Sequence, residues 1–167
     1  MTSPDSTSRP GVPEDAVLSR LRDLGFDLPQ APTPVAAYVP VVRSGSLLFV
    51  SGQIPLLDGA LTSTGAVPSD RSVDEAVEAA RRCGLNALAV IARELDGRLD
   101  RVRRIVRVGV FVASDPGFGE QPRVANGVSE LLVSIFGERG RHARAAVGCA
   151  ALPLEATVEV EMVVEVD

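Results

Sequence analysis

Three glutamates near the C-terminus stand at alternating positions in the segment VEVEMVVEV, residues 158–166. Alternation of apolar and polar residues predicts a β-strand, so Glu159, Glu161 and Glu165 would share one of its two faces. Because like charges on one face repel, that face is either open to water or lies opposite cations. Arg144, in the segment before this one, is the first candidate for such a cation.

Several residue types on which catalysis often depends are scarce or absent. All 17 basic residues are arginines, which excludes a Schiff-base lysine and a P-loop lysine. The single histidine, His142, leaves no multi-histidine metal site, so we expect neither a metal nor an organic cofactor. We interpret His142 as a residue of a helix-to-strand connection and not as a catalyst, because the sequence shows no partner that would orient it.

Composition favours a small-molecule ligand over a macromolecular one. A net charge of −5, one tyrosine and no tryptophan argue against nucleic-acid binding, which needs a basic surface and often stacking aromatic rings. Charges interrupt every apolar run before the roughly 18 residues that a membrane span requires. The first residues contain no apolar leader region, so the expected location is the cytoplasm.

Cys83 and Cys149 lie far apart and are expected to fill the core.

The length of 167 residues suits one domain with a preceding N-terminal segment. Residues 1–12, rich in serine, threonine and proline, are expected to form a disordered tail. Residues 13–33 would hold a helix, at 13–25, and a proline-rich connection. The main domain would span residues 34–167.

Helix and turn signals are clear in the first two thirds of this domain. Two apolar runs joined at residues 43–46 predict a β-hairpin. Ser72 and Glu75 form a capping box that opens a long helix ending near Gly97. A second helix is predicted from Pro122, with Gly137 as its stop.

The remaining segments predict a sheet with one covered face. Strands are expected at residues 101–113, 143–151 and 156–166, and in the first of these Val106, Val108, Val110 and Val112 would lie on one side. Two helices can cover one face of a sheet, but no second pair is available for the other. That other face mixes apolar and charged residues and suits a subunit interface with paired charges, so a homo-oligomer is expected. Its predicted members include Ile105, Phe111, Val163, Arg103 and Arg107.

Four segments stand out over about residues 34–167: LLFVSGQIPL, FVAS, VANGVSELL and, most specifically, ARAAVGCAALPLEATVEVE. In order and spacing they resemble the Rid family, also called the YjgF family. The N-terminal helix and GRHAR are similar to a longer subgroup. The resemblance implies an α+β, chorismate-mutase-like fold, with a mixed β-sheet and two helices packed on one face. It also implies a homotrimer in which the sheets form an inner barrel and each subunit interface holds a cleft. In active members this cleft hydrolyses 2-enamino and 2-imino acids to 2-oxo acids and ammonia.

The resemblance also assigns roles to individual residues. Arg144 matches the arginine that binds the substrate carboxylate, and Glu159 matches the glutamate that orients water and moves its proton. Ala146 stands where the family often has cysteine, so thiol chemistry is absent while the backbone contact is expected to persist. Tyr38 matches a tyrosine that closes over the cleft. Ser51 and Gly52 match positions whose backbone faces the ligand, and Asn126 matches an asparagine on a helix near the site.

Each assignment has a simpler alternative. Arg144 could be only an ion-pair partner of Glu159 or Glu161 at an interface. Tyr38 could be a half-buried strand aromatic. At the level of function, the chain could bind small carboxylates without catalysis, could act on a larger substrate accommodated by residues 53–70, or could cleave RNA or inhibit translation. The acidic composition makes the RNA alternative the weakest.

Overall fold

The structure, a computed structural model, describes residues 15–31 and 37–167. A five-stranded sheet in the order β1-β2-β7-β5-β6 forms its centre. The strands are β1 (Val41–Ser44), β2 (Leu47–Gln53), β5 (Val102–Ala113), β6 (Ala143–Cys149) and β7 (Val158–Val166). β5 and β6 run parallel while the other neighbours are antiparallel, so the sheet is mixed, as predicted.

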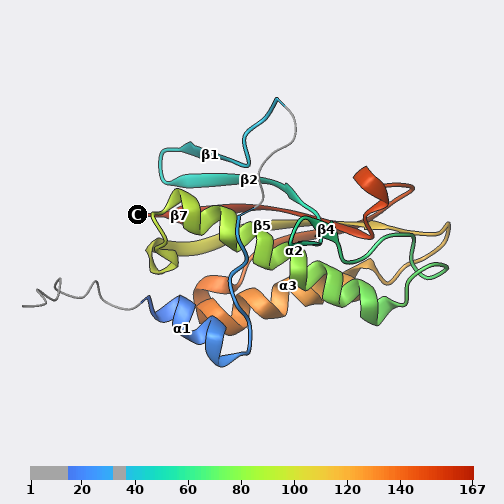
Figure 1. Cartoon of the computed structure of the whole chain (residues 1–167), viewed down its shortest axis with the longest axis horizontal. Helices are drawn as coiled ribbons and strands as arrows, with labels where there is room; N and C mark the ends of the chain where they lie inside the picture. The colour runs from blue at the N-terminus through green and yellow to red at the C-terminus, as the bar shows by residue number, and fades with distance from the viewer. Residues whose placement is uncertain (1–14, 32–36) are drawn as a thin grey trace, which may run out of the picture.

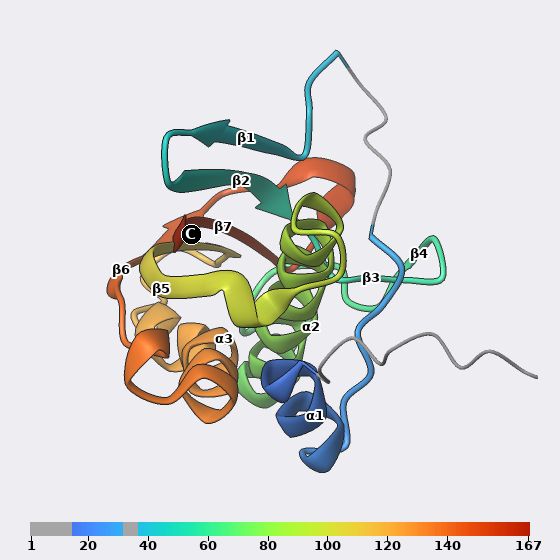
Figure 2. The same cartoon turned by 90° about the vertical axis from the view of Figure 1, so that its left-hand side faces the viewer.

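Two long helices lie side by side on one face of this sheet (Figures 1 and 2). They are α2 (Val73–Glu94) and α3 (Gln121–Phe136). The shorter elements are α1 (Ala16–Asp23), β3 (Leu56–Leu57), β4 (Ala60–Leu61) and the 3₁₀ turns η1 (Leu99–Arg101), η2 (Gly137–Gly140) and η3 (Pro153–Glu155). The prediction of an α+β sheet with two helices on one face is therefore confirmed.

Local signals at the helix ends act as predicted. The Ser72 hydroxyl accepts the Glu75 backbone N–H at 3.2 Å, and the Glu75 carboxylate accepts the Ser72 N–H at 2.8 Å. Gly137 ends α3 with a φ of 61°. The two helices pack closely because Gly127 has no side chain, since a Cβ there would collide with the backbone carbonyl of Val77.

The alternating pattern of β7 places its valines and methionine in the core. Val158, Val160, Met162, Val164 and Val166 are buried against the helices, while the residues between them are partly exposed on the opposite face. The three glutamates therefore share the face that the helices leave open, as predicted. We call this the open face of the sheet.

The predicted faces of the first half of β5 are wrong. Ile105 is completely buried and Val106 is exposed, the reverse of the expectation. Two register shifts against β7, between Val102 and Arg104 and between Ile105 and Arg107, each insert an extra residue. Because a β-bulge turns the following side chains to the opposite face, simple alternation holds only from Val108 onward.

The cysteine prediction is half correct. Cys83 is fully buried, and its thiol lies 3.5 Å from the carbonyl of Val158. Cys149 lies at the end of the edge strand β6 and is partly exposed, so it does not fill the core. The edge position leaves one side of this residue without a neighbouring strand in the described chain.

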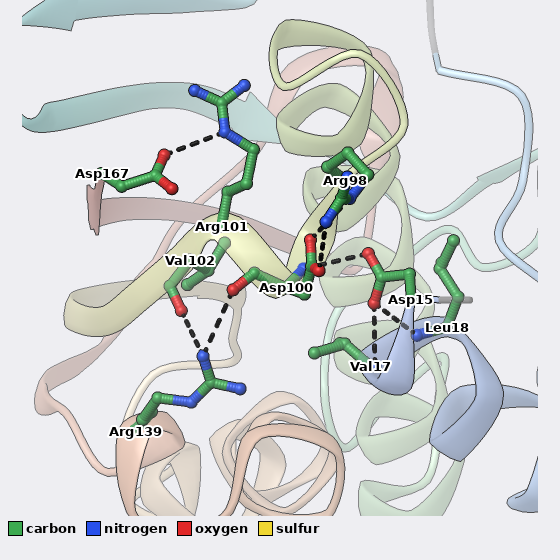
Figure 3. Close-up of polar contacts among 9 residues, drawn as sticks. All are labelled: Asp15, Val17, Leu18, Arg98, Asp100, Arg101, Val102, Arg139 and Asp167. Atoms are coloured by element: carbon green, nitrogen blue, oxygen red, sulfur yellow. Dashed lines mark hydrogen bonds and ion pairs between the residues drawn. The ribbon is translucent and has the colours of Figure 1, made fainter. Parts of the chain in front are cut away.

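The N-terminal helix is shorter than predicted and is joined to the domain through Asp15. The Asp15 carboxylate accepts the backbone N–H groups of Val17 and Leu18 at 2.8 and 3.1 Å, and also that of Asp100 in η1 at 2.9 Å (Figure 3). One buried side chain thus caps α1 and holds it against η1. The predicted tail and residues 32–36 of the proline-rich connection lie outside the described residues.

Candidate functional site

Glu159 lies on the open face directly over Gly52 of the neighbouring strand β2. A Cβ atom at position 52 would overlap the Glu159 carboxylate. Glycine is therefore required here by close approach, and it fixes where the carboxylate lies. Glu161 lies in the same way over Gly109 of β5.

A β-bulge in β2 shapes the backbone beside Glu159. Val50 pairs with Met162 and Gln53 with Val160, so β2 carries one extra residue at Ser51–Gly52. The buried Gln53 amide donates to the carbonyls of Ser51 and Gly52 at 2.9 and 3.2 Å. Gln53 thereby stabilises the bulge, a structure that often re-aims groups beside an active site.

Ser51 connects this bulge to the segment that carries Tyr38. The Ser51 hydroxyl donates to the carbonyl of Val39 at 2.8 Å, and its backbone N–H donates to the carbonyl of Pro40 at 2.9 Å. Tyr38, the residue before Val39, is 52% exposed. An exposed tyrosine at this position is free to contact a ligand or a second copy of the chain.

The Glu159 carboxylate has the properties of a proton-transfer group. It is half-buried, and no cation or hydrogen-bond donor of residues 15–31 or 37–167 contacts it. Burial raises the pKa of Glu159, and the negative charge of Glu161 raises it further. A raised pKa brings a carboxyl group closer to neutral pH, where it can both accept and return a proton.

The other two glutamates are placed differently. Glu161 forms an ion pair with Arg107 at 2.9 Å. Glu165 lies opposite Leu47, at the far end of β2 from the bulge. Of the three carboxylates, only that of Glu159 lies beside the Ser51–Gly52 backbone.

Arg144 belongs to the opposite face of the sheet. It lies beside Val108 of β5, which in turn lies opposite Met162 of β7, and both of these side chains are buried under the helices. Because laterally paired residues point to the same side of a sheet, Arg144 faces α3. Its guanidinium donates to Asn126 Oδ1 at 2.9 Å, Ser129 Oγ at 3.1 Å and the Pro122 carbonyl at 3.2 Å.

The contacts of Arg144 hold its guanidinium but leave its charge unpaired. Pro122, Asn126 and Ser129 recur at helical spacing on one face of α3, and each supplies a neutral acceptor. In the described part of the chain no carboxylate pairs with Arg144. Three of its five N–H groups are used, so Nε–H and one N–H of Nη2 remain for a ligand. Two donors suffice for bidentate binding of one carboxylate.

The expected ion pair of Arg144 with Glu159 or Glu161 does not form within one chain. The side chains lie on opposite faces, and β6 is separated from β7 by β5. Two strand spacings of about 4.8 Å add roughly 10 Å to that separation. The chain therefore presents two half-sites, one made by Arg144 and Asn126 and one made by Glu159 and the Ser51–Gly52 bulge.

Comparison with known proteins identifies the family of this chain. The model of the YjgF/chorismate mutase-like family, whose description suggests an endoribonuclease, matches residues 18–166. The chain belongs to this family. Protein TCP17 of Trypanosoma cruzi is 46% identical over 157 residues, which cover 93% of this chain and 98% of that protein.

Two further proteins are similar to this YjgF-family chain over most of its length. The crystal structure of the protein Atu1372 of Agrobacterium tumefaciens has a TM-score of 0.85 and 46% identity, and covers 92% of this chain and 93% of that one. A protein of Dermatophagoides farinae named 2-iminobutanoate/2-iminopropanoate deaminase is 30% identical over 139 residues, covering 83% of this chain and 93% of that protein. These similarities establish the YjgF fold for the whole described domain.

Sequence reasoning missed two residues, Gln53 and Ser129, that support the half-sites of this YjgF-family chain. Gln53 stands in the segment LLFVSGQIPL, where a glutamine directly after Ser-Gly in an expected strand is a visible polar signal. Ser129 has no such signal, because its contact with Arg144 depends on how α3 lies against β6. His142 lies in the connection between η2 and β6, as predicted, and the structure adds the partners that the sequence does not show: its ring contacts the Gly140 carbonyl at 2.6 Å and Ser129 Oγ at 3.0 Å.

The described residues contain no cluster of histidine, cysteine, aspartate or glutamate side chains suited to a metal ion. They also include no candidate for a membrane span, since no helix there combines the necessary length and apolarity. Ala146 faces the same side of β6 as Arg144 and packs partly against the core. The side chain at this YjgF-family position therefore contributes apolar contact alone.

Proposed function

We propose that this protein hydrolyses 2-enamino and 2-imino acids to 2-oxo acids and ammonia, in a cleft formed between two copies of the chain. The observation that carries the proposal is the pair of complementary half-sites on opposite faces of one sheet. Arg144 offers an unpaired cation and two free donors, and Glu159 offers an uncompensated carboxyl group with a raised pKa. The deaminase name of the 30% identical relative supports the same reaction class.

The chemistry divides between the two half-sites. Arg144 binds the substrate carboxylate through two hydrogen bonds, and this bidentate contact orients the adjacent carbon of the C=N bond. Glu159, in its ionised form, removes a proton from water as the oxygen adds to that carbon. The carboxyl group then returns the proton to nitrogen, which gives a carbinolamine. The same carboxylate next moves the hydroxyl proton to nitrogen as the C–N bond breaks, so ammonia departs and a 2-oxo acid remains. For an enamine, a proton is first delivered to the neighbouring carbon, which yields the imine.

The remaining matched residues have supporting roles in this proposal. The backbone of the Ser51–Gly52 bulge faces the reacting end of the ligand, Tyr38 closes over it, and Asn126 holds Arg144. The Ala146 backbone lines the cleft without a thiol. No step requires a metal or an organic cofactor.

A turnover assay tests the proposal directly. Freshly generated 2-iminopropanoate and 2-iminobutanoate should disappear faster with the protein than in buffer, with stoichiometric release of ammonia. The competing function is carboxylate binding without catalysis, which gains support because the Arg144 half-site is complete within one chain. Saturable binding of 2-oxobutanoate, without any acceleration of imine hydrolysis, would favour carboxylate binding as the function. RNA binding, which the net charge of −5 disfavours, would appear as salt-dependent retention of RNA.

Assembly is the second part of the proposal, since two half-sites need two copies. The open face exposes Phe49 in β2, Val106 in β5 and Val147 in β6, which are large apolar side chains that a monomer would leave in water. A closed ring of three copies, as in the family resemblance, would bury these side chains and bring Arg144 of one copy toward Glu159 of the next.

We expect a trimer in dilute solution and a loss of assembly when the open face is charged. Light scattering after size-exclusion chromatography should give three times the 17.5 kDa chain mass at micromolar concentration. Phe49→Asp should dissociate the trimer, because it places a charge in an apolar interface. Leu24→Asp, at an equally exposed apolar residue that directly follows α1, is the control and should leave the trimer intact. A monomeric parent protein would contradict both the interface and the shared cleft.

A further inference from the structure

A chain of hydrogen bonds connects Arg144 to His142 through Ser129. The Gly140 carbonyl lies 2.6 Å from His142 Nδ1, and Ser129 Oγ lies 3.0 Å from His142 Nε2. Arg144 Nη1 then donates to the same Ser129 oxygen at 3.1 Å. The side chains of Ser129, His142 and Arg144 border a small hollow of about 280 Å³, which is also lined by Val133 and Arg141.

The partners determine the direction of each hydrogen bond. A backbone carbonyl can only accept, so His142 Nδ1 carries the proton that is donated to Gly140. In the neutral ring Nε2 is then an acceptor, and the Ser129 hydroxyl donates to it. A lone pair of Ser129 Oγ is consequently directed at the guanidinium of Arg144.

The surroundings keep His142 in this neutral form. Burial lowers the pKa of His142, and the positive charge of Arg144 lowers it further, while the bond to the Gly140 carbonyl acts in the opposite direction. A neutral imidazole accepts the Ser129 proton without adding a second positive charge beside Arg144.

We propose that Ser129 and His142 are positioning residues for Arg144, and that they hold its guanidinium in the orientation in which it receives a carboxylate. This inference rests on the proposed function, because Arg144 is the carboxylate-binding residue there. The Arg144 side chain is exposed and would otherwise sample several rotamers. Acceptors from Ser129, Asn126 and Pro122 restrict it, so less order has to be gained when the ligand binds.

Binding of 2-oxobutanoate, the unreactive product of 2-iminobutanoate hydrolysis, measures this role without turnover. Ser129→Ala should raise the dissociation constant roughly tenfold by removing one acceptor of a charged donor. Ser129→Thr keeps the hydroxyl and should restore most of the affinity. Ser134→Ala, at an exposed serine of the same helix, is the matched control and should bind as the parent does. Where turnover occurs, Ser129→Ala should raise KM more than it lowers kcat.

Variants of His142 separate positioning from general packing. His142→Gln can still present an acceptor to Ser129 and should bind nearly as well as the parent, whereas His142→Leu cannot and should resemble Ser129→Ala. Because both residues act through one chain of hydrogen bonds, the double variant Ser129→Ala with His142→Leu should lose no more than either single variant. Additive losses of affinity in the double variant would contradict a role through one chain of hydrogen bonds.

The single histidine makes a spectroscopic test possible. Nitrogen NMR should show a neutral ring protonated on Nδ1, and 2-oxobutanoate should shift its resonances in the parent but not in Arg144→Ala. An Nε2–H tautomer, or unchanged affinity in Ser129→Ala, would overturn the inference while leaving imine hydrolysis intact. Covalent labelling of Ser129 by a fluorophosphonate would identify a nucleophile in place of a positioning residue. A parent protein that neither binds 2-oxobutanoate nor turns over imines would instead refute the proposed function.

Discussion

Arg144→Ala is expected to lower kcat/KM for 2-imino acids by roughly thirty- to a thousandfold, equivalent to about 2–4 kcal/mol of lost transition-state stabilisation. The variant removes a charge-assisted, bidentate contact from a site whose remaining groups cannot replace it. Arg144→Lys should recover little, because an ammonium group keeps the charge but lacks the planar pair of donors. Both variants are measured by initial rates with freshly generated 2-iminobutanoate and by binding of 2-oxobutanoate.

Two controls separate this effect from altered folding or charge. Arg93→Ala removes an arginine from the exposed end of α2 and should keep the parent rate. The Arg144 variants should remain trimeric, since the exposed apolar residues of the open face do not include Arg144. A trimer that turns over imines at the parent rate after Arg144→Ala would show that the assigned carboxylate site is wrong.

Glu159→Gln is expected to lower kcat by about a hundred- to ten-thousandfold, the usual contribution of a positioned acid or base. The amide keeps the shape of the side chain over Gly52 but can neither accept nor return the proton. Glu165→Gln, on the same face of β7 but away from the bulge, is the matched control and should retain activity. Equal losses in both variants would argue against a specific role for Glu159.

The same substitution should raise thermal stability at neutral pH. The folded state raises the pKa of Glu159, so the protein disfavours ionisation of this carboxyl group. This free-energy penalty is absent below the pKa of about 4.3 that Glu159 has in the unfolded chain. It is fully developed once the pH has risen through the higher pKa of the folded state. Glu159→Gln should therefore melt at a higher temperature than the parent at pH 7 and at a similar temperature near pH 3. A gain in stability together with a loss of rate is typical of an active-site charge.

Mixing the two inactive variants tests whether each site is shared between copies. If Arg144 comes from one copy and Glu159 from the next, a random mixture of Arg144→Ala and Glu159→Gln chains restores both residues at about one quarter of interfaces. Refolding the mixture should therefore recover about a quarter of the parent activity, while each variant alone stays inactive. A mixture without activity, in which mixed trimers are shown to form, would place the site within one chain.

Much of the local structure could be predicted from the sequence, because its causes lie within a few residues. The Ser72–Glu75 capping box, the Gly137 stop and the alternation of β7 each depend on neighbours in the chain. The two bulges of β5 could not be predicted in this way. They arise from the pairing of β5 with β7, a strand about fifty residues away, and they exchanged the faces of Ile105 and Val106.

The residue types of the candidate site follow from sequence, and their arrangement follows from tertiary structure. The family resemblance pointed to Arg144 and Glu159 by position alone, and nothing in the local pattern indicates that they face opposite sides of the sheet. The parallel register that sets Arg144 beside the buried Val108 decides this, as does the bulge that brings Gly52 under Glu159. The acceptors around Arg144 likewise depend on how α3 packs on β6. Strand register and helix packing come from contacts distant in sequence, so only the folded chain shows that the two half-sites lie on opposite faces of the sheet.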